Sequence, residues 1–154
     1  MRTLIAFIVT VGLAVSAYAA EFTGPQPKLP TAALIIDTAK GPAQFTAEMA
    51  VTSRQQEQGL MFRKSIAPNE GMLFDFGKEQ ETAFWMKNTL IPLDMLFIDK
   101  TGRIVRTVER AVPESLTPIS SGEPVRAVLE VNSGTASRLE IQPGDVVIHP
   151  IFQR

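Results

Sequence analysis

Short apolar runs with a period of two, separated by turn residues, dominate this sequence from residue 33 onward. In the clearest run, Phe45, Ala47, Met49 and Val51 alternate with polar or small residues. Such alternation is typical of β-strands with one buried face, because successive side chains of a strand point to opposite sides. The pattern predicts seven or eight short strands, over residues 33–37, 44–51, 71–76, 82–88, 93–98, 103–112, 125–131 and 146–149.

Only two segments carry helix signals. Thr52 and Gln55 have the spacing of a capping box, and Gly59 follows as a stop signal. Ser133 can cap a second short helix that runs through Leu139. We therefore expect a mainly β (α+β) fold, either a compact barrel-like domain or a sandwich, with two short peripheral helices.

The N-terminus has the features of a signal peptide. An apolar run covers residues 4–15, which is 12 residues, and the small-residue pattern Ala17-x-Ala19 follows it. The run is shorter than the ~20 residues that span a bilayer, although an uncleaved membrane anchor remains the alternative. We expect a signal peptide over residues 1–19, cleavage after Ala19, and export to the periplasm or the cell exterior, with membrane contact only during export.

A proline-rich stretch comes next. Pro25, Pro27 and Pro30 fall in a segment without apolar periodicity, which predicts a flexible leader over residues 20–31. The remaining residues, 32–154, are expected to form a single domain, and we expect a monomer.

Composition excludes several classes of function. The 154 residues include 15 basic and 16 acidic side chains, for a net charge of −1, which gives no electrostatic case for nucleic-acid binding. The sequence has no Cys, so disulfides, thiol catalysis and iron–sulfur clusters are excluded. The lone histidine, His149, cannot build a zinc site or bring a serine triad with it. We expect no cofactor and no metal.

Methionine offers one alternative to that expectation. Thioether sulfur can bind Cu(I), and the sequence past the signal peptide has five methionines. We favour a packing role for them, because Met49 and Met95 fall on apolar strand faces and Met commonly fills gaps in cores.

Asp94 is the least expected residue in the densest part of the sequence, residues 59–99. It interrupts an apolar strand, where an ionised carboxylate is costly unless it is paired. Arg63 and Lys87 are the nearest possible partners of Asp94, because they lie in the same part of the sequence. Two interpretations stay open, namely a structural salt bridge that fixes strand register and a polar small-ligand site lined by Arg63, Lys87, Asn88 and Asp94.

Several ordered motifs resemble one known family. These are the segments 59–63, 71–74, 85–89, 92–94 and 129–131, followed by Gly144-Asp145. Together they are similar to the DUF192 family of small, often exported prokaryotic proteins without an established activity, over about residues 33–149. The resemblance implies a compact, mostly β, barrel-like domain with short helices, and it implies no reaction, substrate or cofactor. Its characteristic stretch contains Arg63, Met86, Lys87, Asn88, Thr89 and Asp94. The candidate ligand-binding residues are thus Arg63, Lys87, Asn88, Thr89 and Asp94.

Three hypotheses about function follow. The first is a non-enzymatic exported module that binds an unknown small molecule or envelope component around Arg63 and Asp94. The second is a carboxylate-based hydrolase in which Asp94 works with Asp75 or Glu70 as acid and base. The third is an envelope protein-interaction module that uses the aromatic strand edge at Phe84 and Trp85.

Overall fold

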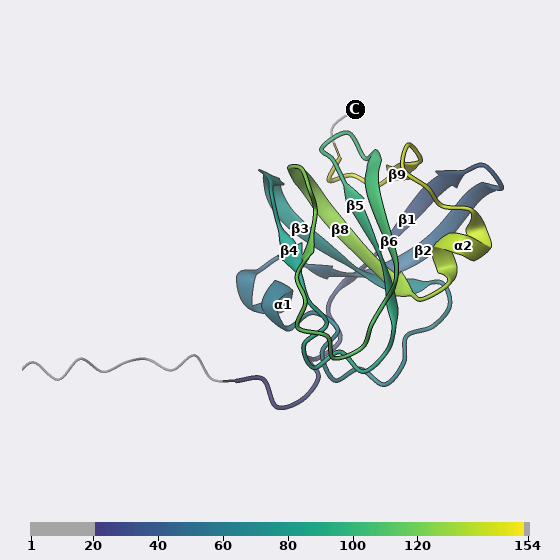
Figure 1. Cartoon of the computed structure of the whole chain (residues 1–154). Coiled ribbons are helices and arrows are strands. Elements are labelled where there is room, and N and C mark those ends of the chain that lie inside the picture. The colour runs from purple at the N-terminus through teal and green to yellow at the C-terminus, as the bar shows by residue number, and fades with distance from the viewer. Residues whose placement is uncertain (1–20, 153–154) are drawn as a thin grey trace, which may run out of the picture.

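A computed structural model describes residues 21–152 and shows a mostly β fold built on one curled sheet (Figure 1). Seven strands form this half-barrel in the order β6-β5-β8-β3-β2-β1-β9. Their bounds are β1 Thr31–Thr38, β2 Gly41–Ala50, β3 Glu70–Gln80, β5 Leu93–Ile98, β6 Ile104–Ala111, β8 Val125–Asn132 and β9 Val146–Ile148. A second sheet has two short strands, β4 (Ala83–Phe84) and β7 (Ile119–Ser120), and the helices are α1 (Ser53–Gln58) and α2 (Thr135–Leu139). The predicted fold class is confirmed, while the predicted signal peptide lies outside the described residues.

Two hairpins have the local signals that the sequence predicted. The β1–β2 and β5–β6 pairs are antiparallel and sequential, whereas β2 and β3 are parallel. Gly102 closes the β5–β6 turn with a φ of 87°, and a side chain there would lie 2.4 Å from the carbonyl oxygen of Val147. Beside it, the Val147 N–H donates to the Gly102 carbonyl at 2.7 Å, so β9 approaches the start of β6 and partly closes the barrel.

The two faces of the curled sheet bury separate apolar clusters. The inner cluster has members from all seven strands, among them Leu34, Leu73 and Val147, so it lies on the concave side. The outer cluster lies on the other face and includes Met72, Phe74, Met86, Met95, Phe97 and Val128. It is covered by partly buried residues of β4, β7 and the segment after α1. Because both faces are buried, all six residues of β5 are buried.

Some local expectations need correction. The strand expected over residues 82–88 is only two residues long, because the chain turns at Asn88, which adopts a φ of 55°. The Thr89 N–H donates to the Met86 carbonyl at 3.0 Å within that turn. The strand expected to end at Gly77 continues through a bulge to Gln80. The capping box of α1, with Thr52 and Gln55, is confirmed.

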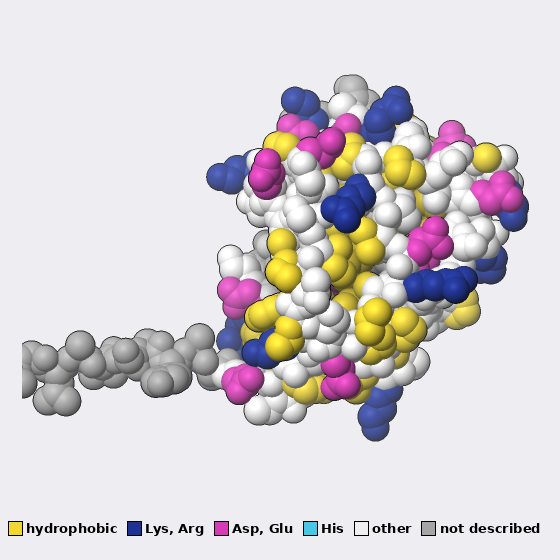
Figure 2. All heavy atoms as spheres, in the orientation of Figure 1, with side chains coloured by type: hydrophobic (Ala, Val, Ile, Leu, Met, Phe, Trp, Pro, Cys, Tyr) yellow, Lys and Arg dark blue, Asp and Glu magenta, His cyan; other side chains and the backbone are white. Residues whose placement is uncertain are grey.

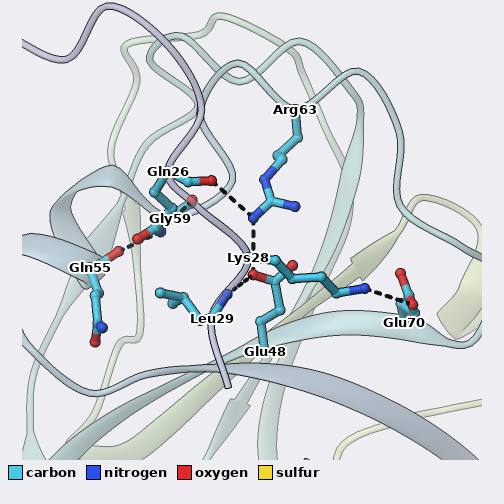
Figure 3. A network of polar contacts seen from close by, with 8 residues as sticks. All are labelled: Gln26, Lys28, Leu29, Glu48, Gln55, Gly59, Arg63 and Glu70. Atoms are coloured by element: carbon cyan, nitrogen blue, oxygen red, sulfur yellow. Dashed lines mark hydrogen bonds and ion pairs between the residues drawn. The ribbon is translucent and has the colours of Figure 1, made fainter. Parts of the chain in front are cut away.

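The described part of the expected flexible leader is attached to the domain by polar contacts (Figure 3). Gln26, only 7% exposed, donates from Nε2 to the carbonyl oxygens of Gln55 and Gly59 at 3.1 and 2.8 Å. The Leu29 N–H donates to Glu48 Oε2 at 2.8 Å. These partners are distant in sequence, so local composition could not reveal the attachment.

Candidate functional site

Asp94 is bound by the backbone of the domain itself. Its side chain is fully buried, and its two carboxylate oxygens accept from the backbone N–H groups of Arg110 and Ala136, each at 2.9 Å. Asp94 pairs with Val131, a member of the inner cluster, so it lies on the inner side of the sheet. Hydrogen bonds to backbone N–H groups, instead of a salt bridge, therefore satisfy this carboxylate and tie β5 to β6 and to the first turn of α2.

Arg63 lies on the other side of the sheet. Its Nη2 donates to Glu48 Oε2 at 3.0 Å and to the Gln26 carbonyl at 3.4 Å (Figure 3). Glu48 pairs with Met72, which belongs to the outer cluster. The expected cluster around Arg63 and Asp94 is therefore not formed, because the two side chains face opposite sides of one sheet.

The acid–base pairs of the hydrolase hypothesis are not assembled either. Asp75 pairs with Arg126, and Glu70 pairs with Lys28 at 3.3 Å. Asp75 lies opposite Ala127 and Asp94 opposite Val131, so four residues of β8, or roughly 13 Å, separate them along the sheet. Glycoside chemistry needs carboxyl groups about 5 to 9.5 Å apart across a cleft. Asp75 and Asp94 do not meet that requirement. Glu70 lies on the outer face with Met72, on the side of the sheet opposite to Asp94.

A cleft of about 970 Å³ opens on the outer side of the sheet, between the N-terminal residues 21–22, α1, β4 and the turn at 85–89. Lys87, Asn88 and Thr89 line it, whereas Arg63 and Asp94 do not. Five aromatic side chains contribute to the lining, namely Phe22, Phe74, Phe76, Phe84 and Trp85. Charged side chains in the lining are Glu21, Arg54, Glu57, Lys87 and Glu130. Three of the five predicted ligand-binding residues thus share this cleft.

The turn at 85–89 positions those three residues. The Asn88 carbonyl accepts from the Phe62 N–H at 2.8 Å, and Asn88 Nδ2 lies 3.9 Å from Met61 Sδ. Thr89 is buried and donates from Oγ1 to the Lys87 carbonyl at 3.3 Å. These contacts join the turn to the chain after α1 and to itself, so it forms one wall of the cleft.

Two cations at the rim of the cleft lie over aromatic rings. Lys87 Nζ lies 5.4 Å from the ring centre of Trp85 and 3.5 Å from Glu21 Oε1. Arg54 Cζ lies 5.0 Å from the ring centre of Phe22. The N-terminal residues 21 and 22 therefore contribute directly to the rim.

Glu130, on β8, is the residue of the cleft that the sequence analysis missed. It lines the cleft and is only 4% exposed. Among the described residues, no ion pair involves its carboxyl. Its oxygens are not among the fully enclosed polar atoms that lack a partner, so they open to the cleft. Burial raises the pKa of Glu130 from 4.5 to about 8, so the neutral acid predominates at pH 7. A carboxyl with a raised pKa that lines a cleft is a candidate functional group.

The surroundings of Glu130 are apolar. Its cross-strand neighbours are Met72 on β3 and Met95 on β5. Two residues earlier on the same face, Val128 lies between Phe74 and Phe97. In the sequence of this strand, Glu130 alternates onto the same face as Arg126 and Val128. The apolar Val128 was the available signal that this face is buried.

A second cavity of about 660 Å³ lies near the C-terminus, among residues of β1, β2 and the segment after β9. His149 is the titratable side chain in its lining. Burial lowers the pKa of His149, and its Nδ1 accepts from the Ile151 N–H at 3.3 Å. His149 is therefore neutral at pH 7, and no charged partner in the lining activates it.

Two searches of residues 21–152 gave negative results. No group of three or more His, Asp or Glu side chains is arranged to hold a metal ion. No helix in this part of the chain has the length and apolarity to cross a membrane.

The fold and the cleft define a small half-barrel domain with a ligand-sized cavity outside its sheet. The chain belongs to the DUF192 family, an uncharacterized ACR family, whose model matches residues 35–149. Among curated proteins, no sequence matches.

Two solved structures are similar to this chain. One is described as a candidate transcription regulator from Sinorhizobium meliloti 1021, with 47% identity, a TM-score of 0.77, and coverage of 80% of this chain and 96% of that one. The other is a protein of unknown function from Novosphingobium aromaticivorans DSM 12444, with 38% identity, a TM-score of 0.78, and coverage of 90% and 99%.

Proposed function

We propose that this protein is an exported, non-enzymatic module that binds a small ligand in the cleft above Glu130. The unpartnered Glu130 carboxyl carries this proposal. A ligand group that pairs with this carboxyl would gain about 1.5–3 kcal/mol, the usual contribution of a hydrogen bond to a charged group. The cleft volume of about 970 Å³ also falls in the range of about 300–1,000 Å³ that is typical of ligand sites.

Export is the second part of the proposal. The apolar run over residues 4–15 and the Ala17-x-Ala19 pattern support it. A small-molecule ligand is favoured over nucleic acid, because the net charge is −1 and acidic and basic side chains are interspersed over the face in Figure 2. The description of the Sinorhizobium relative as a candidate transcription regulator is the competing hypothesis.

A thermal-shift screen tests ligand binding. The purified protein is heated with a panel of cationic, anionic and neutral small molecules, and a ligand that binds the folded state raises Tm. Trp85 is the only tryptophan and lines the cleft, so its fluorescence reports binding there. Each hit should weaken in Glu130→Gln and persist in Glu109→Gln, which changes an exposed glutamate in the same way. Hits that bind Glu130→Gln and Glu109→Gln equally well would place binding elsewhere, and a panel without hits would contradict the proposal.

An envelope interaction module is a second candidate, because the apolar side chains near the cleft are exposed. Trp85 is 49% exposed, and Leu90, Val112 and Leu116 are also exposed. They lie on two loops that are joined by the hydrogen bond from the Met86 N–H to the Ser115 carbonyl, at 2.9 Å. Capture of an envelope protein by the wild type but not by Leu116→Lys would favour this candidate.

A further inference from the structure

We infer that the ligand of the cleft is an organic ammonium cation, with the Glu130 carboxylate as its counter-ion and the aromatic side chains as its walls. This inference rests on the proposed function and names the chemical class of its ligand. Glu130 has no cationic partner in the described part of the chain, and aromatic rings surround the cleft. A neutral ligand would show the opposite pH dependence of binding.

The first observation is that no described cation forms an ion pair with Glu130, whereas three cations pair with other carboxylates. Lys87 pairs with Glu21, Arg63 with Glu48, and Arg126 with Asp75. Arg54, on α1, lies over the Phe22 ring at the rim. The carboxyl at the floor of the cleft is thus mostly neutral at pH 7 on its own, and a cation bound beside it would favour the ionised form.

The second observation is the aromatic lining. Phe84 contacts Phe74 and Phe97 edge-on, with ring centres 4.9 and 6.3 Å apart, and these two rings flank Val128 on the same face as Glu130. Ring faces attract ammonium groups, and an aromatic cage is the usual site for quaternary ammonium ligands. Lys87 and Arg54 already lie over rings at the rim, so the surface of this cleft holds cations.

The third consideration distinguishes a cation from a neutral ligand. A cation binds the ionised carboxylate, so binding releases a proton and strengthens as pH rises toward 8. A neutral hydrogen-bond acceptor binds the protonated acid, so its affinity falls over the same range. The other titratable groups in the lining are Glu21, Arg54, Glu57 and Lys87. On the same face of the sheet, Glu70 of β3 pairs with Lys28, and Glu48 of β2 pairs with Arg63. The direct cross-strand neighbours of Glu130, Met72 and Met95, are uncharged.

Choline and its uncharged isostere 3,3-dimethylbutan-1-ol form a matched pair of probes. Titration calorimetry on the full protein should show saturable choline binding, with the isostere at least about tenfold weaker. Choline affinity should rise about tenfold from pH 6 to pH 7, with proton release visible as a dependence on buffer ionisation enthalpy. Glu130→Gln should abolish the pH dependence and weaken binding, whereas Glu109→Gln should behave as the wild type.

Three outcomes would overturn the inference. These are equal affinity for choline and the isostere, affinity that falls with pH, and absence of saturable choline binding. If neutral or anionic molecules from the thermal-shift screen bind in a Glu130-dependent manner while choline does not, the proposed function stands and only the ligand class is wrong. If no molecule binds at all, both fall.

Discussion

Replacing Glu130 by Gln should flatten the dependence of stability on pH. The pKa of Glu130 is about 8 in the folded protein and 4.5 in the reference state. At pH values between 4.5 and 8, Glu130 is protonated in the folded state and ionised in the unfolded state. The free energy of unfolding of the wild type therefore falls as pH rises from 4.5 to 8, and the stabilisation is fully present only below the lower value.

The magnitude follows from the two pKa values. Each pKa unit corresponds to 1.36 kcal/mol, so the whole window is worth about 5 kcal/mol. From pH 5 to pH 8 the free energy of unfolding of the wild type should fall by about 3.5 kcal/mol. This is less than the full window because part of the fall occurs below pH 5. Gln has nearly the same shape as Glu and does not titrate, so Glu130→Gln should gain about this much stability relative to the wild type between these two pH values.

Urea unfolding at pH 5, 6, 7 and 8 measures this difference. Glu109→Gln, at an exposed position, is the matched control and should follow the wild-type profile. Parallel profiles for the wild type and Glu130→Gln would refute the reasoning, since they would mean that the carboxyl is hydrated or paired in the folded state.

Three further substitutions test other parts of the structure. Asp94→Asn should destabilise the protein by about 3 kcal/mol, measured by urea unfolding. The amide is a weaker acceptor than the carboxylate, and its NH2 group would face buried backbone N–H groups. Ligand binding above Glu130 should stay unchanged. Arg63→Met leaves the buried Glu48 carboxylate without its cation and with only the Leu29 N–H as a donor, so we expect a loss of about 3 kcal/mol and faster proteolysis before residue 30. Gly71→Ala would place a methyl group 2.4 Å from the Glu130 carbonyl oxygen, and the Tm should drop with a loss of about 3 kcal/mol. Wild-type stability in any of these variants would contradict the corresponding contact.

Local sequence signals predicted local structure well. The capping box at Thr52 and Gln55 depends on residues three positions apart, and it is present. The strand expected over residues 82–88 was wrong because the alternation there continues past the turn at Asn88. Nothing in a period of two indicates that a residue adopts a left-handed conformation.

The site could be predicted only in part, because it depends on sheet order. Lys87, Asn88 and Thr89 were found together because they are contiguous, although their role in binding stays a prediction. The predicted pairing of Arg63 with Asp94 was wrong, because closeness in the sequence does not show which face of a sheet a side chain occupies. Glu130 was missed because the covering of the second face of β8 comes from distant segments.

The position of Glu130 has a consequence for hydrogen exchange. Its strand, β8, is bonded on both sides, to β3 and β5, so the floor of the cleft belongs to the most protected part of the sheet. The walls come from α1, which buries none of its residues, from the turn at 85–89 and from residues 21–22. These walls should exchange their amide protons through local opening, long before β8 does. Access to the cleft is thereby separated from global unfolding, and mutations in the walls can change the rate of ligand entry while the strand that carries Glu130 remains in place.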